Sequence, residues 1–313
     1  MVTGGAGFIG RHLTEELLRR GADEVLVLDS SLAGACDIPA ASSTRCKLVR
    51  FRLGRDCLRA LRPHLHGIDY VFHLAAEKHT KAQRDPAAAL DSNIDGTYCL
   101  ARAAGEAGVK RIVFASSVYV YGRMDGPALS EAETPLPNTI YGISKLAGEH
   151  LLRHCHARYN LEYNVLRYFF TYGPARSAGR GYTSVTTTTF ERLLVNQPPI
   201  IYGDGNQIFD YVYVGDVIDA TIRAAAGERV NDIFNIGSGI GTSIADLVGL
   251  MMTISRRPLP ITYGERDETF GSSRVADIRK AAERLHWQPQ TNLMDGLTMT
   301  CESLALQRNA GAS

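Results

Sequence analysis

The feature that most constrains the fold of this chain is a run of glycines near its start, Thr3-Gly4-Gly5-Ala6-Gly7-Phe8-Ile9-Gly10. In such a run Gly4 allows a tight turn, Gly7 lets the backbone approach a pyrophosphate, and Gly10 lets a helix pack on a strand. A helix expected at His12–Arg20 would direct its positive N-terminal end at the phosphates. The spacing therefore predicts the first turn of a βαβ unit that binds a dinucleotide.

An acidic residue supports this interpretation and selects the nucleotide. Asp29 follows the apolar run Val25–Leu28, where a second strand is expected. A carboxylate there accepts from both ribose hydroxyls and repels a 2′-phosphate, which favours NAD over NADP. A glycine-rich turn without a ligand is the alternative, but strand, glycines, helix, strand and acid follow in order. The first strand has only Met1, Val2 and Thr3, so either the native start lies upstream or the central strand is unusually short.

Short apolar runs alternate with helical patterns through the first half of the chain. Strands are expected at Val25–Leu28, Leu48–Phe51, Tyr70–Leu74, Arg111–Ala115, Tyr163–Arg167 and Ile233–Ile236, and helices at His12–Arg20, Leu90–Ala107 and Ile143–Tyr159. This alternation predicts an α/β protein with a doubly wound parallel sheet of the Rossmann type. We expect an NAD-binding domain over residues 1–173, to which 211–239 return, and a smaller α/β substrate-binding lobe from 174–210 and 240–313. Within that lobe the polar run Thr186–Thr189 is expected to be structural.

Composition excludes several kinds of partner. The 34 Lys and Arg residues nearly balance 33 Asp and Glu residues, so there is no overall basic field for nucleic acid. No apolar run approaches the ~20 residues of a membrane helix, and no signal-peptide pattern opens the chain. The six cysteines are scattered, without the close pairing of a zinc site, at positions 36, 46, 57, 99, 155 and 301. We therefore expect a cytoplasmic protein with reduced thiols and no metal.

A phenol and an ammonium group are the strongest candidates for catalysis. Tyr141 and Lys145 stand at i and i+4 of a predicted helix, on one face. The ammonium group is expected to lower a phenol pKa that starts near ~10, so that Tyr141 takes a proton from a substrate hydroxyl while hydride leaves carbon. Ser116 and Ser117 end the strand before it, where a hydroxyl could bridge substrate and tyrosine. A solvated helix face is the alternative.

Together these residues resemble the extended short-chain dehydrogenase/reductase family, in particular its NAD-dependent nucleotide-sugar epimerases and dehydratases such as the UDP-glucose 4-epimerases. The resemblance covers nearly the whole chain. Its further motifs are His73-Leu74-Ala75-Ala76, Asn93-Ile94-Asp95-Gly96-Thr97, Tyr121-Gly122, Leu166-Arg167-Tyr168-Phe169, Tyr172-Gly173-Pro174, Gly203-Asp204-Gly205, Asp210–Val217, Phe234–Gly239, Ala276–Ala281 and Leu285–Pro289. The resemblance implies that Ser117, Tyr141 and Lys145 are catalytic.

The resemblance also implies a set of residues that bind NAD. They are Gly4, Gly7, Phe8, Ile9, Gly10, Asp29, Ser30, Leu53, Gly54, Leu74, Ala75, Ala76, Lys78, Ser116, Tyr141, Lys145 and Tyr168. Lys78 resembles a lysine that 4-epimerases place against the NAD phosphates, although a surface lysine is the alternative. The acid that the family has near Leu53 to meet the adenine is missing, so contacts there are expected to be apolar or from the backbone.

Residues beside the catalytic serine distinguish the reactions of the family. The 4,6-dehydratases resemble one another in carrying an Asp-Glu pair there, and glucuronate decarboxylases keep the glutamate. This chain has Val118 and Tyr119 after Ser117, so elimination lacks its acid and base. Reversible oxidation at C4 remains, which suits a 4-epimerase of UDP-hexoses or UDP-hexuronates. A dehydratase or reductase with a displaced acid/base, and a non-catalytic nucleotide-sensing protein, stay open as alternatives.

The resemblance further implies the residues that hold the nucleotide sugar, which are Ser117, Phe170, Thr171, Tyr202, Tyr211, Arg266 and Arg274. Phe170 and Phe209 replace a family asparagine and arginine, which weakens the expected grip on the diphosphate. Arg266 matches a second diphosphate arginine, unless it forms a surface ion pair with Asp267 or Glu268.

Arg274 falls near a position that gates the sugar substituents, where a cation could favour a carboxylated hexose such as glucuronate. It could equally pair with Asp277. Family members also resemble one another in forming homodimers, through the helices that correspond to Leu90–Ala107 and Ile143–Tyr159. The apolar stripes of those two helices could equally be core.

Overall fold

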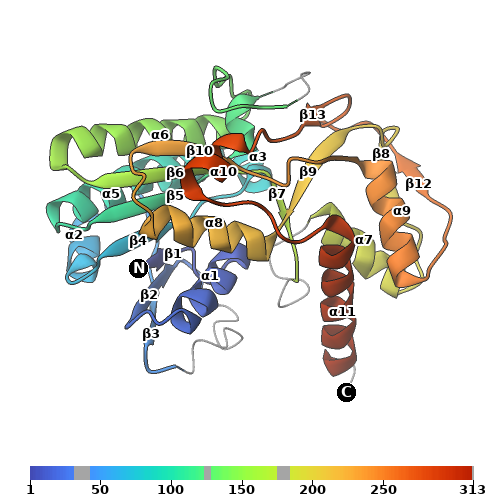
Figure 1. Cartoon of the computed structure of the whole chain (residues 1–313), viewed down its shortest axis with the longest axis horizontal. Helices are drawn as coiled ribbons and strands as arrows, with labels where there is room; N and C mark the ends of the chain where they lie inside the picture. The colour runs from blue at the N-terminus through green and yellow to red at the C-terminus, as the bar shows by residue number, and fades with distance from the viewer. Residues whose placement is uncertain (32–42, 123–127, 175–183, 312–313) are drawn as a thin grey trace.

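The computed structural model describes residues 1–31, 43–122, 128–174 and 184–311, and it has the α/β fold that the sequence predicts. The main sheet contains seven strands in the order β10-β6-β5-β4-β1-β2-β3, all parallel (Figure 1). Their bounds are β1 (Val2–Thr3), β2 (Val25–Asp29), β3 (Cys46–Arg50), β4 (Tyr70–His73), β5 (Arg111–Ser117), β6 (Glu162–Tyr168) and β10 (Asp232–Ile236). Every strand expected from the sequence is present, with small differences at the ends.

The strand order reverses at β1. The chain runs outward from β1 to β2 and β3, then returns to the other side of β1 for β4, β5 and β6. The carboxyl ends of β1 and β4 therefore flank a crevice at the switch point, where ligands bind in such sheets. β1 is short, but hydrogen bonds extend its pairing with β4, because Met1 O accepts from Phe72 N at 2.9 Å and Thr3 O from Leu74 N at 3.1 Å.

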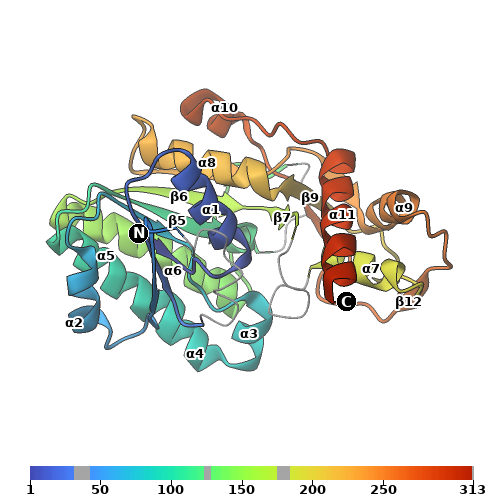
Figure 2. The same ribbon diagram turned by 90° about the horizontal axis from the view of Figure 1, so that it is seen from below.

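Helices cover both faces of the main sheet (Figure 2). One face carries α1 (Phe8–Arg19), α8 (Val214–Ala226) and α10 (Arg279–Leu285), and the other carries α2 (Leu58–Leu61), α5 (Gly96–Glu106) and α6 (Ile140–Tyr159). Two short helices, α3 (His79–Arg84) and α4 (Pro86–Leu90), follow β4. Each face buries an apolar cluster, so the sheet is sandwiched between two hydrophobic cores.

Three helices differ from their expected bounds. The helix expected at His12–Arg20 begins at Phe8, directly after the glycine turn. The helix expected at Leu90–Ala107 is divided, because a π-helical turn at Asp91–Asp95 separates α4 from α5. The helix expected at Ile143 begins at Ile140, since Thr139 Oγ1 caps it by accepting from Gly142 N at 3.0 Å. Tyr141 therefore lies inside the first turn of α6.

A second lobe lies beside the carboxyl edge of the main sheet (Figure 1). Its strands form a four-stranded sheet, in which β9 pairs with β7, β11 and β13, and a two-stranded sheet of β8 and β12. The strands are β7 (Phe170–Tyr172), β8 (Ile200–Tyr202), β9 (Ile208–Tyr213), β11 (Gly241–Ser243), β12 (Thr262–Gly264) and β13 (Ser273–Arg274), and the helices are α7 (Val185–Leu194), α9 (Ile244–Ser255) and α11 (Leu293–Gly311). The chain thus enters this lobe at Phe170, and α8 and β10 return to the main sheet.

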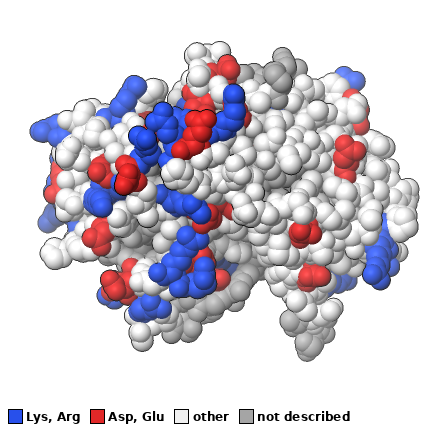
Figure 3. Space-filling view, in the orientation of Figure 1, with Lys and Arg blue, Asp and Glu red and all other residues white. Residues whose placement is uncertain are grey.

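In Figure 3 charged side chains of both signs lie next to each other, mostly over the main-sheet part of this face. The formal net charge of the chain is +1. Within the described ranges no helix is both long and apolar enough to cross a membrane. The cysteines described there are free thiols, and Cys36 lies outside the described residues.

Candidate active site

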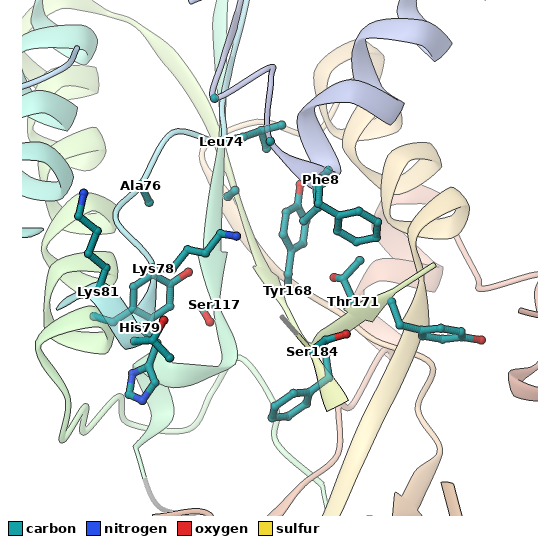
Figure 4. Close-up of a pocket in the computed structure, with 18 of the residues that line it drawn as sticks. Phe8, Leu74, Ala76, Lys78, His79, Lys81, Ser117, Tyr168, Thr171 and Ser184 are labelled. Carbon is teal, nitrogen blue, oxygen red and sulfur yellow. The ribbon is translucent and has the colours of Figure 1, made fainter. Parts of the chain in front are cut away.

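A cavity of about 1420 Å³ lies between the carboxyl edge of the main sheet and the second lobe. Figure 4 shows Phe8 and Leu74 at one end, Lys78, His79 and Ser117 along one side, and Thr171 and Ser184 on the other. The cavity brings together most residues that the sequence nominated, which are Gly4, Gly7, Phe8, Ile9, Gly10, Asp29, Ser30, Leu53, Leu74, Ala75, Ala76, Lys78, Ser116, Ser117, Tyr141, Lys145, Tyr168, Phe170, Thr171, Tyr202 and Tyr211. Gly54, Arg266 and Arg274 do not line it.

The glycine turn forms a close-packed cradle at the N-terminus of α1. Gly4 has a φ of +71°, and a Cβ there would lie 2.7 Å from Ala75 N, while a Cβ on Gly10 would collide with the Gly4 carbonyl oxygen. A Cβ on Gly7 would meet only Gly4 O, at 3.1 Å, and Gly7 borders the cavity. Backbone amides at a helix N-terminus, with no side chain in front of them, fit a pyrophosphate.

The carboxylate of Asp29 faces the same end of the cavity from the end of β2. Its Oδ2 accepts from Ala6 N at 3.0 Å and its Oδ1 accepts from Ser31 N at 2.9 Å. Each carboxylate oxygen has a second lone pair, so Asp29 is held against the glycine turn and still has acceptor capacity for ribose hydroxyls. Together with the cradle, this donor and acceptor set fits NAD.

Leu53 and Gly54 differ in their relation to the cavity. Leu53 is buried and lines it, which agrees with the expected apolar contact at this end. Gly54 packs instead against Asp91, because a Cβ on Gly54 would lie 2.7 Å from Asp91 Oδ2. Asp91 in turn accepts from Arg55 N at 2.9 Å. The glycine therefore allows this loop to lie against the helices, and its expected contact with NAD stays a prediction.

Ser117, Tyr141 and Lys145 meet at the centre of the cavity. The side chains of Ser117 and Tyr141 are hydrogen-bonded. Lys145 Nζ donates to Ala115 O at 2.7 Å and lies 5.7 Å from the centre of the Tyr141 ring. The end of β5 and the first two turns of α6 thus place a hydroxyl, a phenol and an amine beside the glycine cradle.

Burial governs the ionisation of this group. It raises the pKa of Tyr141 to about 12, against the hydrogen bond with Ser117, which lowers it. Burial also lowers the pKa of Lys145 to about 7, against the carboxylate of Glu149, which raises it. The expectation that Lys145 lowers the pKa of Tyr141 is therefore wrong for the protein groups alone, because desolvation of the phenolate is the larger effect.

Sequence reasoning missed Glu149, which lies behind the cavity. Both of its oxygens are bound by Arg167, through Nε at 3.0 Å and Nη2 at 2.7 Å, and Ser116 Oγ also donates to it. The hydroxyl of Ser116 is therefore committed to Glu149. The sequence does contain a signal for Glu149, because Tyr141, Lys145 and Glu149 stand at i, i+4 and i+8 and therefore share one face of the helix.

The two phenylalanines that replace expected polar residues stack on each other. The ring centres of Phe170 and Phe209 are 4.4 Å apart, and Tyr211 lies 6.0 Å from Phe170. All three line the cavity, so this wall is aromatic. Beside it Tyr211 OH and Gln207 Oε1 are buried without a hydrogen-bond partner in the described part of the chain.

The run Thr186–Thr189, which the sequence analysis expects to be structural, lies at the cavity. All four threonines line the cavity at the N-terminus of α7. Ser184, just before them, also lines it (Figure 4). Ser184 Oγ caps this helix by accepting from Thr187 N at 3.2 Å. Ser184 Oγ also lies 2.7 Å from Thr186 Oγ1 and 3.1 Å from Thr187 Oγ1. These hydroxyls and the positive end of the helix are suited to an anion.

Arg266 and Arg274 lie outside the cavity wall. The guanidinium carbon of Arg266 lies 4.0 Å from the ring centre of Phe270, and Arg266 forms no ion pair with Asp267 or Glu268 in the described structure. The expected ion pair is therefore absent from the described residues, and the expected contact of Arg266 with a diphosphate stays a prediction.

Arg274 is buried, with its guanidinium carbon 4.9 Å from the ring centre of Tyr119 and a hydrogen bond to that side chain. Arg274 does not pair with Asp277, which binds Arg279 at 2.6 Å. Its Nε and Nη1 have no partner among the described residues. Arg274 is not among the residues that line the cavity, and the ring of Tyr119 lies between its guanidinium and the cavity. The expected role of Arg274 at the sugar stays a prediction.

Tyr119 and His79 are further cavity residues that the sequence did not nominate. The Tyr119 ring lies 5.7 Å from the Tyr141 ring, edge to face, and 4.7 Å from the His79 ring. Lys78 lines the cavity next to His79, and burial lowers its pKa. Among the residues described, no group of His, Cys, Asp and Glu is arranged to hold a metal.

Comparison with known proteins gives a consistent result. The model of the NAD dependent epimerase/dehydratase family matches residues 1–237. The UDP-glucose 4-epimerase of Mycolicibacterium smegmatis is 33% identical over 313 residues, with 96% of this chain and 97% of the relative covered. A UDP-glucose 4-epimerase of Thermotoga maritima, solved with UDP-glucose, is 33% identical with a TM-score of 0.90, and 99% of this chain and 98% of that chain are covered.

A UDP-glucuronic acid 4-epimerase of Bacillus cereus, solved with UDP-glucuronic acid and NAD, is 29% identical with a TM-score of 0.85, and 98% of each chain is covered. The family model spans both the glycine cradle and the Ser117, Tyr141 and Lys145 group. This chain belongs to the NAD dependent epimerase/dehydratase family.

Proposed function

We propose that the chain is an NAD-dependent 4-epimerase of nucleotide sugars, acting on a UDP-hexose or UDP-hexuronate. The observation that carries this proposal is the meeting of Ser117, Tyr141 and Lys145 in one cavity with the glycine cradle. The positions after Ser117 hold Val118 and Tyr119, without a carboxylate for elimination. The absence of a carboxylate at these two positions supports reversible oxidation over dehydration.

The cofactor would be held by the cradle of Gly4, Gly7 and Gly10, by the Asp29 carboxylate and by Lys78, which lines the same cavity. When bound, NAD supplies an acceptor and donor of hydride and, in its oxidised form, a positively charged ring. Such a charge would offset part of the desolvation that raises the pKa of Tyr141.

Tyr141 takes the proton of the sugar 4-hydroxyl as C4 is oxidised, and it returns that proton after the planar 4-ketose has turned over. Ser117, hydrogen-bonded to Tyr141, aligns the reacting oxygen with the phenol. Lys145 is held by its hydrogen bond to Ala115 O. With a pKa of about 7, it can gain or lose a proton near neutral pH. The enclosed position of these groups keeps water away from the ketose.

The substrate diphosphate would lie at the N-terminus of α7. The hydroxyls of Ser184 and Thr186–Thr189 supply donors there, where the stacked Phe170 and Phe209 provide none. Tyr202 and Tyr211 offer aromatic surface to the nucleotide end. This arrangement supports hydrogen bonding by hydroxyls and backbone amides as the main grip on the phosphates.

The test is incubation of purified protein with UDP-glucose, UDP-N-acetylglucosamine and UDP-glucuronate, followed by proton NMR and mass spectrometry. Epimerisation leaves the mass unchanged and alters the coupling of the C4 proton, and Tyr141→Phe should reduce the rate at least ~100-fold. NAD should be released when the protein is denatured. A product lighter by one water would support the dehydratase, and the absence of turnover would support a nucleotide sensor.

We also propose a homodimer that assembles in the cytoplasm through α5 and α6. These helices pack on each other, and the outer side of α6 presents Ile143 with 42% of its surface exposed. Free thiols in the described chain fit a reducing compartment. Light scattering should give twice the chain mass of 34.2 kDa, and Ile143→Arg should lower it. A monomer at micromolar concentration would contradict the dimer.

A further inference from the structure

One carboxylate bridges the cavity from the second lobe to the nucleotide-binding part. Glu268 lies in the segment between β12 and β13, and its Oε1 is bound by His79 Nε2. Its Oε2 accepts from Gln83 Nε2 at 2.8 Å. Both partners belong to α3, next to Lys78 on the proposed cofactor side of the cavity. Asp267 and Thr269, on either side of Glu268, line the cavity from the second lobe. A single side chain therefore fastens the two sides together.

The bond fixes the histidine ring. A carboxylate only accepts hydrogen bonds, so Nε2 of His79 must carry the proton that points at Glu268. The side chain of His79 is 14% exposed, whereas that of Glu268 is 50% exposed. The contact of Glu268 with His79 thus joins an exposed carboxylate to a ring that lines the cavity. We call this contact the clasp.

His79 transmits this contact to the reacting group through aromatic packing. Its ring lies 4.7 Å from Tyr119 at an interplanar angle of 30°, and Tyr119 lies 5.7 Å from Tyr141 at 82°. His79 also meets Tyr141 directly, with ring centres 6.3 Å apart. These spacings are those of favourable aromatic pairs. The second lobe holds Tyr119 from its other side as well, through Arg274.

We propose that Glu268 and His79 are positioning residues, which close the second lobe over the cavity and at the same time fix Tyr141 through Tyr119. This inference rests on the proposed epimerase function, because it assigns the phenol as the proton acceptor. Opening of the clasp would free the segment around Glu268 and release the ring stack. Closure of the cavity and alignment of the phenol would then be one event.

The test compares holoenzyme variants on whichever of UDP-glucose and UDP-glucuronate the wild type epimerises faster. Glu268→Ala should lower kcat roughly 10-fold, the size expected for losing hydrogen bonds to a charged group, with a smaller change in KM. Glu268→Gln should recover part of kcat because it keeps an acceptor oxygen. Glu265→Ala, three residues earlier in the same segment, is the matched control and should retain wild-type kcat.

His79→Phe keeps a ring against Tyr119 but removes the bond to Glu268. It should lose about as much kcat as Glu268→Ala, and the double variant should lose no more than either single one. Losses that multiply in the double variant, or a Glu268→Ala kcat equal to that of Glu265→Ala, would overturn the proposal.

A second readout does not depend on turnover. Arg266 is two residues from Glu268, and trypsin should cut after it faster in Glu268→Ala than in the wild type or in Glu265→Ala. Circular dichroism and thermal unfolding exclude global loss of fold as the cause. If the wild type epimerises no UDP-sugar, the proposed function fails while faster cutting in Glu268→Ala still supports the clasp. Equal cutting in all three proteins rejects the clasp.

Discussion

The hydroxyl of Ser117 is hydrogen-bonded to the phenol of Tyr141, and this contact opposes the burial that raises the pKa of Tyr141 to about 12. Ser116, one residue earlier on β5, has its hydroxyl bound to Glu149 on the other side of Lys145. Adjacent serines at one strand end therefore contact different residues of α6, Tyr141 in its first turn and Glu149 two turns later.

Removal of the Ser117 hydroxyl should move the pH dependence of the reaction. In Ser117→Ala the pKa of Tyr141 rises further, so the ascending limb of kcat against pH should move to higher pH. At a fixed neutral pH the rate should fall roughly 10-fold, because a pKa that is higher by about one leaves about a tenth as much phenolate. Ser116→Ala is the matched control and should leave the limb in place. A limb that moves equally in both variants would show that the serine contact does not set the pKa of Tyr141.

Loss of the Glu149 charge should unfold the protein more readily. Glu149→Gln leaves Arg167 buried, with 3% of its side chain exposed and no anion. Breaking a buried ion pair from one side costs about 3–5 kcal/mol, which urea denaturation can measure. Glu162→Gln is the control, since Arg111 keeps bonds to Ala224 O, Ala225 O and Gly227 O. A smaller loss in Glu149→Gln than in the control would contradict the buried-pair argument.

The sequence predicted the main sheet well, and most of its candidate cofactor residues lie together at the cavity, because glycine spacing and apolar alternation depend on local geometry. Gly4, Gly10 and Asp29 each have a steric or hydrogen-bonding reason that is visible in the order of residues. The same reasoning placed Tyr141 and Lys145 on one helical face. It did not give the direction in which the pKa of Tyr141 moves, because burial comes from the packed lobes rather than from the helix.

The substrate side was predicted less well, for a physical reason. Contacts there join residues far apart in the chain, such as Glu268 with His79, and no local pattern specifies them. Arg274 illustrates the limit, since sequence alone could not choose between Asp277 and the sugar, and the structure stacks it on Tyr119. The threonine run was predicted to be structural, because its position at the cavity depends on how α7 packs and not on a local pattern.

Acid should destabilise the protein through His73. Burial, and then the charge of Lys145, lower the pKa of this histidine to about 3. Thr97 Oγ1 donates to Asn93 O at 2.6 Å, so His73 Nε2 donates to Thr97 and Nδ1 accepts from Thr3. Both ring nitrogens are satisfied only in the neutral form.

The unfolded chain binds a proton at His73 below pH ~6.5 and the folded chain does not, so the free energy of unfolding should fall as pH falls from ~6.5 towards 3. The slope from this group is at most ~1.4 kcal/mol per pH unit. Urea denaturation between pH 7 and 5, above the range where carboxylates titrate, should show it. His73→Gln should lower the slope but not abolish it, because burial also lowers the pKa of the Met1 amino group to about 5. His66→Gln, at an exposed position, should leave the slope unchanged. An unchanged slope in His73→Gln would assign it to other groups.

Arg274 should favour a sugar that carries a carboxylate. A buried guanidinium with Nε and Nη1 unpartnered in the described structure gains more from an added anion than an exposed one does. The ring of Tyr119 lies between Arg274 and Tyr141, which places the cation near the reacting end of the sugar.

The wild type should therefore epimerise UDP-glucuronate with a higher kcat/KM than UDP-glucose. Arg274→Leu should lower kcat/KM for UDP-glucuronate roughly 10-fold, as for a lost charge-assisted hydrogen bond, and change that for UDP-glucose much less. Arg279→Ala, which removes an exposed cation bound to Asp277, should leave the ratio of the two substrates unchanged. If Arg274→Leu lowers both substrates by the same factor, the guanidinium supports Tyr119 and does not select the sugar.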